Sequence, residues 1–321
     1  MSNEHFDFKQ FSIQQDRCAM KVGTDGVLLG AWTPINCKSD QARVLDIGTG
    51  TGLIALMLAQ RLTEAHLSFQ IDALEIDADA AQQAKENILH SPWQESIKII
   101  HNSLQKFATS DPASKISTNE TAASDPENKI RTQGTATSNP ANKIRTDEIT
   151  ASDPASKIRT DEIQKYDLIV SNPPFYNATL KPSDEARAVA RHKDSLPLSE
   201  ITEFAKQHLT EQGTLSLIYP MDYDSEVMTA ATLSGLHPIQ LCDVVTKKGK
   251  PCKRRMATFA LPSHPQKDID RQPLFIRDEK GEYTREYVQL VDDFYLCIFH
   301  SGQTHQLFPQ FFNRCPYPLP S

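Results

Sequence analysis

The stretch VLDIGTGTGLIAL, residues 44–56, decides the fold of this chain. It begins as a short apolar strand and ends with the apolar spacing of a helix. Between the two lie Asp46 and the alternating glycines Gly48, Gly50 and Gly52. Glycine permits a tight turn that approaches a ligand without a Cβ atom in the way, and the amides at a helix start favour a polar ligand group. The stretch therefore predicts a strand–turn–helix unit with a ligand at the turn.

Similar units repeat along the chain. The patterns predict strands at 42–47, 69–75, 97–100, 166–170 and 214–219, and helices at 53–61, 78–87 and 198–209. Short, continuously apolar strands that alternate with amphipathic helices are typical of a parallel sheet covered on both faces. Two later apolar runs, 239–245 and 256–261, flank a basic loop and predict a hairpin. The predicted fold is α/β, a doubly wound and mostly parallel sheet with an antiparallel C-terminal hairpin.

The segment 109–163 differs in composition from the rest of the chain. It contains no aromatic residue and no Leu, Val or Met, and the motif SDPASKI at 110–116 recurs in varied form every 14 residues. Such a segment buries too little apolar surface to offset the entropy of ordering it. We therefore expect one domain formed by 1–108 and 164–296, a disordered tandem-repeat insertion at 109–163, and a C-terminal tail at 297–321.

The composition restricts the class of protein. The chain of 321 residues has a net charge of −7, so bulk charge does not favour nucleic acid, although a local basic patch is compatible with an RNA partner. Its six cysteines form no Cys-x-x-Cys pair, so we expect no metal. The N-terminus lacks the apolar core of a signal peptide, and no apolar run is long enough to span a bilayer. We expect a cytoplasmic monomer without membrane contact.

Two details of the glycine turn favour S-adenosylmethionine over a dinucleotide as the ligand. The glycines alternate strictly rather than following the Gly-x-Gly-x-x-Gly pattern. Asp46 directly precedes them, at a position where a carboxylate meets the ammonium group of this cofactor. Glu75, at the end of the second predicted strand, suits a carboxylate that accepts hydrogen bonds from both ribose hydroxyls. Asp77 is the alternative for that role, although it also suits the N-cap of the next helix.

The tetrapeptide NPPF, residues 172–175, follows a predicted buried strand, and ligands of open α/β sheets bind at the carboxyl ends of strands. The side-chain carbonyl of Asn172 and the backbone carbonyl of Pro173 suit the two hydrogens of a planar amine. Pro173 and Pro174 fix the backbone of the loop, and Phe175 offers a flat face for stacking a base. The segment predicts methyl transfer to an exocyclic amine by in-line displacement, without metal or covalent intermediate.

A basic cluster occupies the predicted C-terminal hairpin. Clustered cations contact phosphates, and beside a base-binding segment they favour RNA contact over a merely solvated loop. Arg187 and Arg191 are weaker candidates for the same role. The predicted RNA-binding residues are Lys247, Lys248, Lys250, Lys253, Arg254 and Arg255.

With these motifs, the segment FKQFSIQQDRCAMKVGTDGVLLGAW, residues 8–32, resembles the start of the bacterial tRNA1(Val) (adenine(37)-N6)-methyltransferases. The stretches 86–93 and 274–296 resemble the same family, which belongs to the class I S-adenosylmethionine-dependent amino-methyltransferases. The resemblance implies a class I Rossmann-like fold. It also implies that Lys21, Thr24 and Asp25 lie near the methionine end of the cofactor, and that residues 172–175 hold an adenine beside the anticodon of a tRNA.

The chain departs from that family in three places. Asn102 and Ser103 stand where the family usually has an Asp that meets the adenine of the cofactor. Phe175 stands where the family often has Tyr. The phenyl ring still offers a flat face for stacking, because stacking does not need the tyrosine hydroxyl. The repeat insertion lies between the third and fourth predicted strands, where we expect it to emerge near the catalytic edge.

Two kinds of alternative stay open. Similar Asn-Pro-Pro motifs serve the methylation of guanine N2 in ribosomal RNA and of a release-factor glutamine. A catalytically silent RNA-binding homologue is an alternative of a different class. The intact NPPF segment argues against the silent homologue, whereas Asn102 and Ser103 favour it.

Overall fold

The computed structural model describes residues 4–18, 20–35, 37, 39–110, 163–175, 196–266 and 268–296. The chain divides into two units, Met1–Ala108 with Gln164–Ser321, and Thr109–Ile163. The predictions for residues 111–162, for Arg187 and Arg191, and for the tail 297–321 lie outside the described residues.

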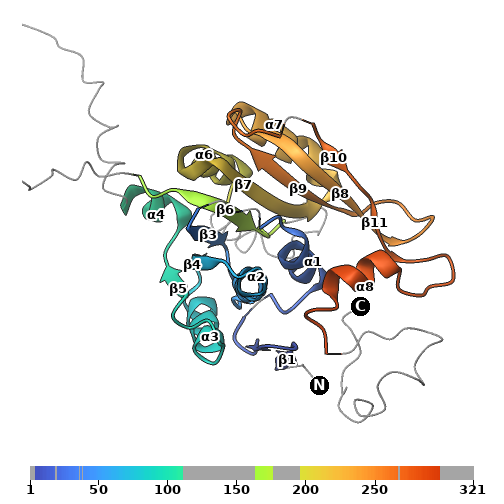
Figure 1. Ribbon diagram of the computed structural model, residues 1–321, viewed down its shortest axis with the longest axis horizontal. Coiled ribbons are helices and arrows are strands. Elements are labelled where there is room, and N and C mark those ends of the chain that lie inside the picture. The colour runs from blue at the N-terminus through green and yellow to red at the C-terminus, as the bar shows by residue number, and fades with distance from the viewer. Residues whose placement is uncertain are drawn as a thin grey trace, which may run out of the picture. The chain divides into compact units, whose positions relative to one another are not determined.

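One mixed sheet forms the centre of the first unit, in the order β10-β8-β9-β7-β6-β3-β4-β5, and β11 also pairs with β8 (Figure 1). From β5 to β7 the neighbouring strands are parallel, whereas β9 is antiparallel to both β7 and β8. This is the α/β sheet with a C-terminal hairpin that the sequence predicts. The strands are β3 (Gln41–Ile47), β4 (Ser68–Glu75), β5 (Ile97–His101), β6 (Tyr166–Ser171), β7 (Leu209–Pro220), β8 (His237–Lys247), β9 (Arg254–Ala260), β10 (Asp270–Arg271) and β11 (Leu274–Arg277).

Helices cover both faces of the sheet (Figure 1). Successive side chains of a strand point to opposite faces, so Val44 of β3 joins the core cluster with α1 and α2, and Leu45 joins the one with α6 and α7. The continuously apolar strands are explained by this double burial. The helices are α1 (Thr24–Trp32), α2 (Leu53–Glu64), α3 (Ala78–Leu89), α4 (Leu104–Ser110), α6 (Leu198–His208), α7 (Asp224–Leu233) and α8 (Arg285–Val291), with a short 3₁₀ turn η2 (Met221–Tyr223) before α7.

The predicted elements are present with small shifts at their ends, except that β7 begins earlier than expected, at Leu209. Its pairing with β6 changes register between Tyr166 and Leu168. Gly213 lies at this irregularity, and a Cβ atom there would come within 2.7 Å of the Tyr166 carbonyl oxygen. The glycine looks like a turn signal in the sequence, but here it allows a strand to pass close to its neighbour.

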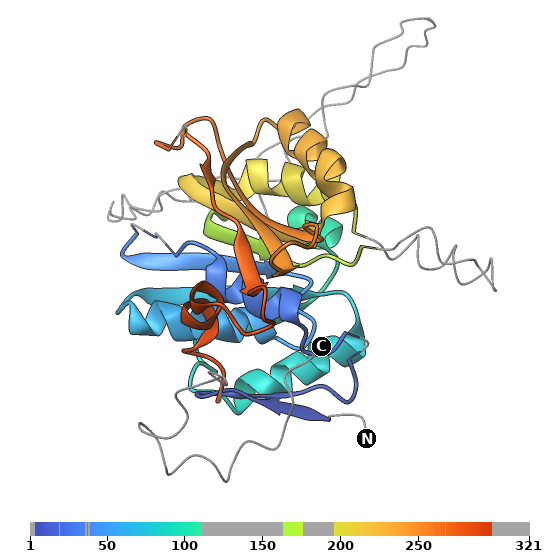
Figure 2. The ribbon, with the colours of Figure 1, turned by 90° about the vertical axis from the view of Figure 1, so that its right-hand side faces the viewer.

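The N-terminal residues form a small antiparallel hairpin, β1 (His5–Asp7) with β2 (Ser12–Gln14), which Figure 2 shows beside α3. Phe8 follows β1 and makes a β-bridge with Tyr295, near the end of the described chain. Its ring also stacks on Phe11 at a centroid distance of 4.7 Å. An aromatic cluster therefore ties the N-terminal hairpin to the residues that follow α8.

We predict that Gly30 of α1 tolerates no larger side chain. A Cβ atom there would lie 2.8 Å from Sδ and 3.0 Å from Cβ of Met57 on α2. Gly30→Val should lower the free energy of unfolding by about 1–3 kcal/mol through overpacking, measured by urea denaturation. Met57→Ala removes Sδ, the nearer of the two obstructing atoms, so the double variant should lose less stability than the sum of the single losses. Additive losses would contradict the contact.

Candidate active site

Parallel strands bring the predicted site residues to one edge of the sheet. β3 ends in the glycine turn, β4 ends at Glu75, and β6 leads directly into Asn172. Ile47 pairs with Ser171, so Gly48 and Asn172 follow at the same level on neighbouring strands. Ligands of open α/β sheets bind at this carboxyl edge. The turn and the NPPF segment, which are far apart in the sequence, are therefore neighbours in the fold.

The glycine turn leaves its outer surface open. Gly48, Gly50 and Gly52 have φ angles of +73°, +57° and +84°, in the left-handed region that favours glycine. A Cβ atom built on Gly48 or Gly50 meets nothing within 4 Å, whereas one on Gly52 meets Ala84 and Ile88 of α3 at 3.6 Å. The turn thus rests on α3 at Gly52, and its Gly48 and Gly50 positions border open space that a ligand can occupy.

Asp46 lies beneath the turn and is fully buried. Its Oδ2 atom accepts a hydrogen bond from the Thr49 hydroxyl at 2.6 Å, whereas its Oδ1 atom has no partner of good geometry among the described residues. Burial raises the pKa of this carboxyl to about 7, although hydrogen bonds from the Thr49 hydroxyl and the Ala55 amide oppose the shift. A buried carboxylate with one oxygen that lacks a well-aligned donor is costly, so the site favours a ligand that supplies a donor or a positive charge.

Glu75 fastens the glycine turn to the end of β4. Its Oε2 atom accepts a hydrogen bond from the Gly50 amide at 2.8 Å, and its Oε1 atom accepts from the amides of Ile76 and Asp77 at 2.9 Å each. Asp77, the alternative to Glu75, caps α3, because its side chain accepts from the Ala80 amide at 2.8 Å. Of the two carboxylates, Glu75 is therefore the one directed at the turn.

Ile76 is a residue of this edge that the motifs do not mark. Its side chain is 56% exposed although it directly follows the buried Glu75. An exposed apolar side chain beside a ligand turn suits contact with a flat apolar ring. The signal in the sequence is an apolar residue one position beyond the end of an apolar strand.

Asn102 and Ser103, which replace the Asp expected from the resemblance, lie between β5 and α4. The backbone amide of Asn102 donates to the backbone carbonyl of Glu75 at 2.9 Å. The side-chain Oδ1 atom of Asn102 accepts from the backbone amide of Ser103 at 3.0 Å. The Ser103 hydroxyl oxygen accepts from the Lys106 amide at 3.3 Å in the first turn of α4. Both side chains therefore take part in starting α4 beside the end of β4.

Phe175 belongs to an aromatic cluster at the end of β7. Its ring centroid lies 5.0 Å from that of Tyr223 and 6.4 Å from that of Tyr219. Within residues 172–175, Pro173 is buried and the other three side chains are half-buried. The NPPF segment is therefore anchored at its centre, and its aromatic ring is backed by two tyrosines that the motif analysis misses.

The N-terminus of α1 reaches the same edge. Arg254 at the start of β9 pairs with Pro220 at the end of β7, which places Arg254 at the carboxyl edge. Its Nε atom donates to Oδ2 of Asp25 at 2.8 Å. Thr24 begins α1, and Lys21 precedes it with an exposed side chain. The structure thus joins one expected cofactor residue, Asp25, to one expected RNA-binding residue, Arg254.

The predicted RNA-binding cations divide into two groups. Arg255 is buried, with Nε 2.6 Å from an oxygen of Asp243 and Nη1 2.8 Å from an oxygen of Asp224. Burial alone would lower the pKa of Arg255, but the hydrogen bonds to both carboxylates outweigh it and raise the pKa. Arg255 therefore joins β8, β9 and the start of α7 rather than facing solvent, which argues against its predicted role. The exposed or half-exposed group is Lys247, Lys248, Lys250, Lys253 and Arg254.

The described chain resumes after the insertion at the edge of the sheet opposite to the NPPF segment. Gln164 precedes β6, and its side-chain amide donates to Asp72 at 2.7 Å and to the Tyr166 hydroxyl at 2.7 Å. Gln164 thus lies at the amino end of β6, whereas Asn172 follows its carboxyl end. The expectation that the insertion emerges near the catalytic edge is wrong at this end, because β6 separates the two points.

Neither a metal cluster nor a membrane span is found where the structure is described. Across those ranges, no group of His, Cys, Asp and Glu could hold a metal ion. The helices described there are all too short or too polar to cross a membrane.

Comparisons with known proteins agree with this geometry. The model of the methyltransferase small domain family matches residues 32–119. Curated relatives from Bacteroides fragilis and Flavobacterium psychrophilum, each named tRNA1(Val) (adenine(37)-N6)-methyltransferase, are 37% and 38% identical over 92% and 91% of this chain and 99% of their own length. A relative of the same name from Tolumonas auensis is 35% identical over 92% of the chain and 98% of its own length. The chain belongs to this methyltransferase family.

The fold of this family member agrees with the class I methyltransferases. A crystal structure described as a predicted O-methyltransferase from Agrobacterium tumefaciens shares the fold with a TM-score of 0.50 and 14% identity, over 84% of this chain and 96% of that one. S-adenosylmethionine is the cofactor of the fold and family. The open surface at Gly48 and Gly50 and the unpartnered oxygen of Asp46 fit this cationic cofactor.

We predict that Asp46 destabilises the cofactor-free methyltransferase as pH rises. Because its pKa is raised to about 7 by burial, the folded state keeps a proton that the unfolded chain releases near pH 4. The contribution of Asp46 to the free energy of unfolding is fully present below about pH 4. It is lost between about pH 4 and 7, and the loss amounts to about 4 kcal/mol.

Asp46→Asn should abolish that slope. At pH 8 the cofactor-free variant should unfold at a higher urea concentration than the parent, whereas at pH 4 the two should be similar. A variant whose stability relative to the parent is the same at both values of pH would show that Asp46 does not titrate in this way.

Proposed function

We propose that this protein transfers a methyl group from S-adenosylmethionine to N6 of an adenosine in a tRNA anticodon loop, at position 37 of tRNA1(Val). The observation that carries the proposal is the adjacency of Gly48 and Asn172, which follow the paired residues Ile47 and Ser171. It brings a cofactor turn and an amine-binding segment to one edge of the sheet. The names of relatives that match this chain along 98–99% of their own length supply the substrate.

The cofactor side of the proposed site is built from β3, β4 and α1. The bound cofactor supplies an electrophilic methyl group. Glu75 uses three acceptor positions for amides, and an ionised carboxylate retains capacity for a ribose hydroxyl. Asp46 and the glycines hold the methionine part, together with Lys21, Thr24 and Asp25. Ile76 packs against the adenine ring.

The target side of the proposed site is the NPPF segment. The Asn172 side-chain carbonyl and the Pro173 backbone carbonyl accept hydrogen bonds from the exocyclic amine and hold it in line with the methyl group. Pro173 and Pro174 keep both acceptors in place. Phe175 stacks on the flipped base, and Tyr223 supports its ring from the end of β7.

The RNA interface is proposed to be the exposed cations around the β8–β9 turn. The turn opens at the carboxyl edge, because β9 begins there beside the end of β7. The residues that would contact phosphates are Lys247, Lys248, Lys250, Lys253 and Arg254. Arg255 is not among them, because it is buried and paired with Asp224 and Asp243. The proposal includes a cytoplasmic protein that acts as a monomer, since one chain supplies every part of the site, with 109–163 as a tolerated insertion in a single domain.

The purified protein should transfer a radiolabelled methyl group to unmodified tRNA. Nuclease digestion should place N6-methyladenosine in one anticodon loop. Label in methylguanosine would favour the ribosomal RNA alternative, label in protein would favour glutamine methylation, and no transfer at all would favour a silent homologue.

Asn172→Ala should lower kcat by about 10²–10³, because it removes one of two acceptors aligned on the amine. The dissociation constant of S-adenosylmethionine should change little, since Asn172 faces the target side. The matched control is Gln82→Ala, which removes an exposed side-chain amide on α3 and should leave both kcat and the dissociation constant unchanged. A full rate for Asn172→Ala would overturn the assigned role.

We predict that Lys253→Ala weakens tRNA binding. The slope of the logarithm of the tRNA association constant against the logarithm of the salt concentration should decrease in magnitude by about 1, because one phosphate contact is lost. Stability should be unchanged, because the Lys253 side chain is exposed. Arg255→Met should have the opposite profile. It leaves two carboxylates without their partner and should cost about 2–4 kcal/mol of stability, with the salt slope retained. A reduced salt slope for Arg255→Met would return Arg255 to the RNA interface.

A further inference from the structure

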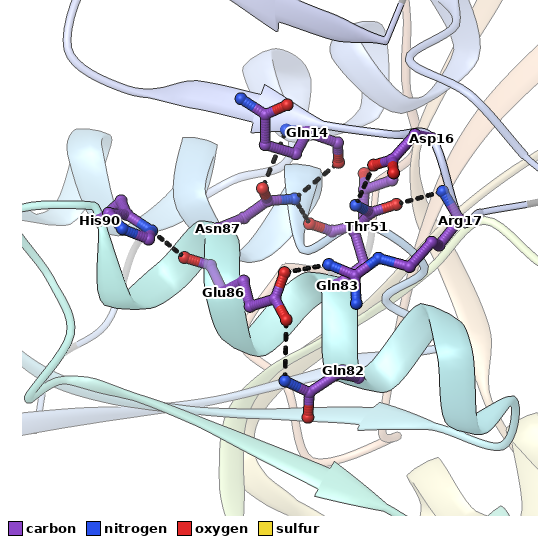
Figure 3. A network of polar contacts seen from close by, with 9 residues as sticks. All are labelled: Gln14, Asp16, Arg17, Thr51, Gln82, Gln83, Glu86, Asn87 and His90. Atoms are coloured by element: carbon purple, nitrogen blue, oxygen red, sulfur yellow. Dashed lines mark hydrogen bonds and ion pairs between the residues drawn. The ribbon is translucent and has the colours of Figure 1, made fainter.

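Residues 14–18 cross the surface of α3 on their way from the N-terminal hairpin to α1, and we call them the N-terminal strap. Figure 3 shows the strap held by side chains of α3. Glu86 and Asn87 follow Gln83 by three and four residues, so all three side chains project from one side of the helix. The strap therefore has a dedicated binding face on α3.

Asn87 lies at the centre of this face and is 3% exposed. Its Oδ1 atom accepts a hydrogen bond from the Gln14 amide at 2.8 Å, and its Nδ2 atom donates to the Gln14 carbonyl at 3.0 Å. The side chain thus pairs with both backbone groups of one residue, as a neighbouring strand would. Nδ2 also donates to the Thr51 carbonyl at 2.9 Å. One side chain therefore joins the strap to the glycine turn (Figure 3).

Gln83 makes a second, similar attachment one turn earlier on α3. Its Oε1 atom accepts from the Arg17 amide at 2.8 Å, and its Nε2 atom donates to the Asp16 carboxylate at 2.7 Å. The Arg17 guanidinium forms an ion pair with Glu86. These contacts hold the C-terminal half of the strap, but they do not reach the glycine turn.

The strap ends at Cys18, which is buried. Burial raises the pKa of its thiol to about 11, and the negative charges of Glu75 and Asp77 add to the rise. The strap meets the glycine turn through Asn87, which joins Gln14 to Thr51.

α3 also supports the glycine turn by packing. A Cβ atom on Gly52 would touch Ala84 and Ile88, which lie one helical turn apart on α3. Asn87 lies between them in the sequence. Thr51, whose carbonyl accepts from Asn87, is 5% exposed. Loss of that donor leaves a buried carbonyl unsatisfied, which favours a different backbone conformation at residues 50–52.

We propose that Asn87 is a positioning residue for the cofactor site: it holds the glycine turn and the N-terminal strap in one arrangement and thereby sets the affinity for S-adenosylmethionine. The inference rests on the proposed cofactor site. The Asn87 side chain is buried and bonds to Gln14 and Thr51, so it acts on the proposed site through those two residues. A site whose two walls are fixed in advance loses less entropy on binding than one whose walls must be ordered by the ligand.

Asn87→Asp tests the proposal with the shape of the side chain preserved. The carboxylate can still accept from the Gln14 amide, but it faces two carbonyl oxygens that have lost their donor. The dissociation constant for S-adenosylmethionine, measured by calorimetry without tRNA, should rise about tenfold or more. In the cofactor-free protein, the amides of residues 14–18 and 49–52 should exchange hydrogen faster. With saturating cofactor, kcat and KM for tRNA should stay within about twofold of the parent, as for removal of uniform binding.

Gln82→Glu is the matched control, because it makes the same amide-to-acid change on α3 at an exposed position whose contact is to the Glu86 side chain. It should leave the dissociation constant and the exchange at 49–52 unchanged. Gln83→Glu releases the strap without touching Thr51, so it should raise the dissociation constant by a smaller factor than Asn87→Asp. If Asn87→Asp does not fold, a rise in Gln83→Glu with none in Gln82→Glu supports the role of the strap, and equal affinities in both overturn it.

The remaining outcomes are distinct. A parent protein that does not bind S-adenosylmethionine overturns the proposed cofactor site together with this inference. A parent that binds, with an Asn87→Asp variant that folds and binds equally well, overturns this inference alone. Lower thermal stability with unchanged cofactor affinity shows a merely structural contact and also overturns it.

Discussion

The end of β4 holds the glycine turn, and the rest of the site depends on that attachment. The Leu74 carbonyl accepts from the amides of Gly48 and Thr49 at 2.9 Å and 3.0 Å, and Glu75 accepts from Gly50. Three consecutive amides are thus directed at one strand end. A turn with left-handed glycines has many alternatives in isolation, and these bonds select one of them. Strand β6, which pairs with β3 on the side opposite to β4, then brings Asn172 to a turn whose shape is already fixed.

Two carboxyl groups, Asp46 and Glu75, lie close to the glycine turn at the carboxyl edge of the sheet, where a cationic cofactor is expected to bind. Asp46 is buried with one oxygen unpartnered, and Glu75 is buried with its oxygens turned to amides. Burying these carboxyl groups lowers the free energy of unfolding of the cofactor-free protein, and binding of the cofactor offsets that loss. The exposed cations of the β8–β9 turn lie on other strands than these two carboxylates, and they form the part of the edge that is proposed to contact RNA. Arg254 is joined to the proposed cofactor side by its ion pair with Asp25.

Local patterns in the sequence predict the parts of the site that are made locally. The glycine turn and the NPPF segment each follow an apolar strand, so their place at the carboxyl edge follows from the parallel topology. Arg255 is different, because its burial depends on Asp224 and Asp243, which pairing of β8 with β9 and packing of α7 bring together. No spacing in the sequence distinguishes it from Arg254. The bonds from Asn87 to Gln14 likewise join residues far apart in the chain, and an Asn within a helix gives no sign of them.

The antiparallel direction of β9 has a consequence for how such a protein meets a macromolecule. The reversal makes β8 end and β9 begin at the carboxyl edge, so the loop between them opens at the same edge as the NPPF segment, with β7 in between. Were β9 parallel to β7, its first residue would lie at the other edge, about 20 Å away for a strand of this length. The lysines of the loop would then lie at the edge opposite to the proposed site of the methyl donor. The orientation of a single strand thus decides whether the cationic loop and the NPPF segment share one edge of the sheet.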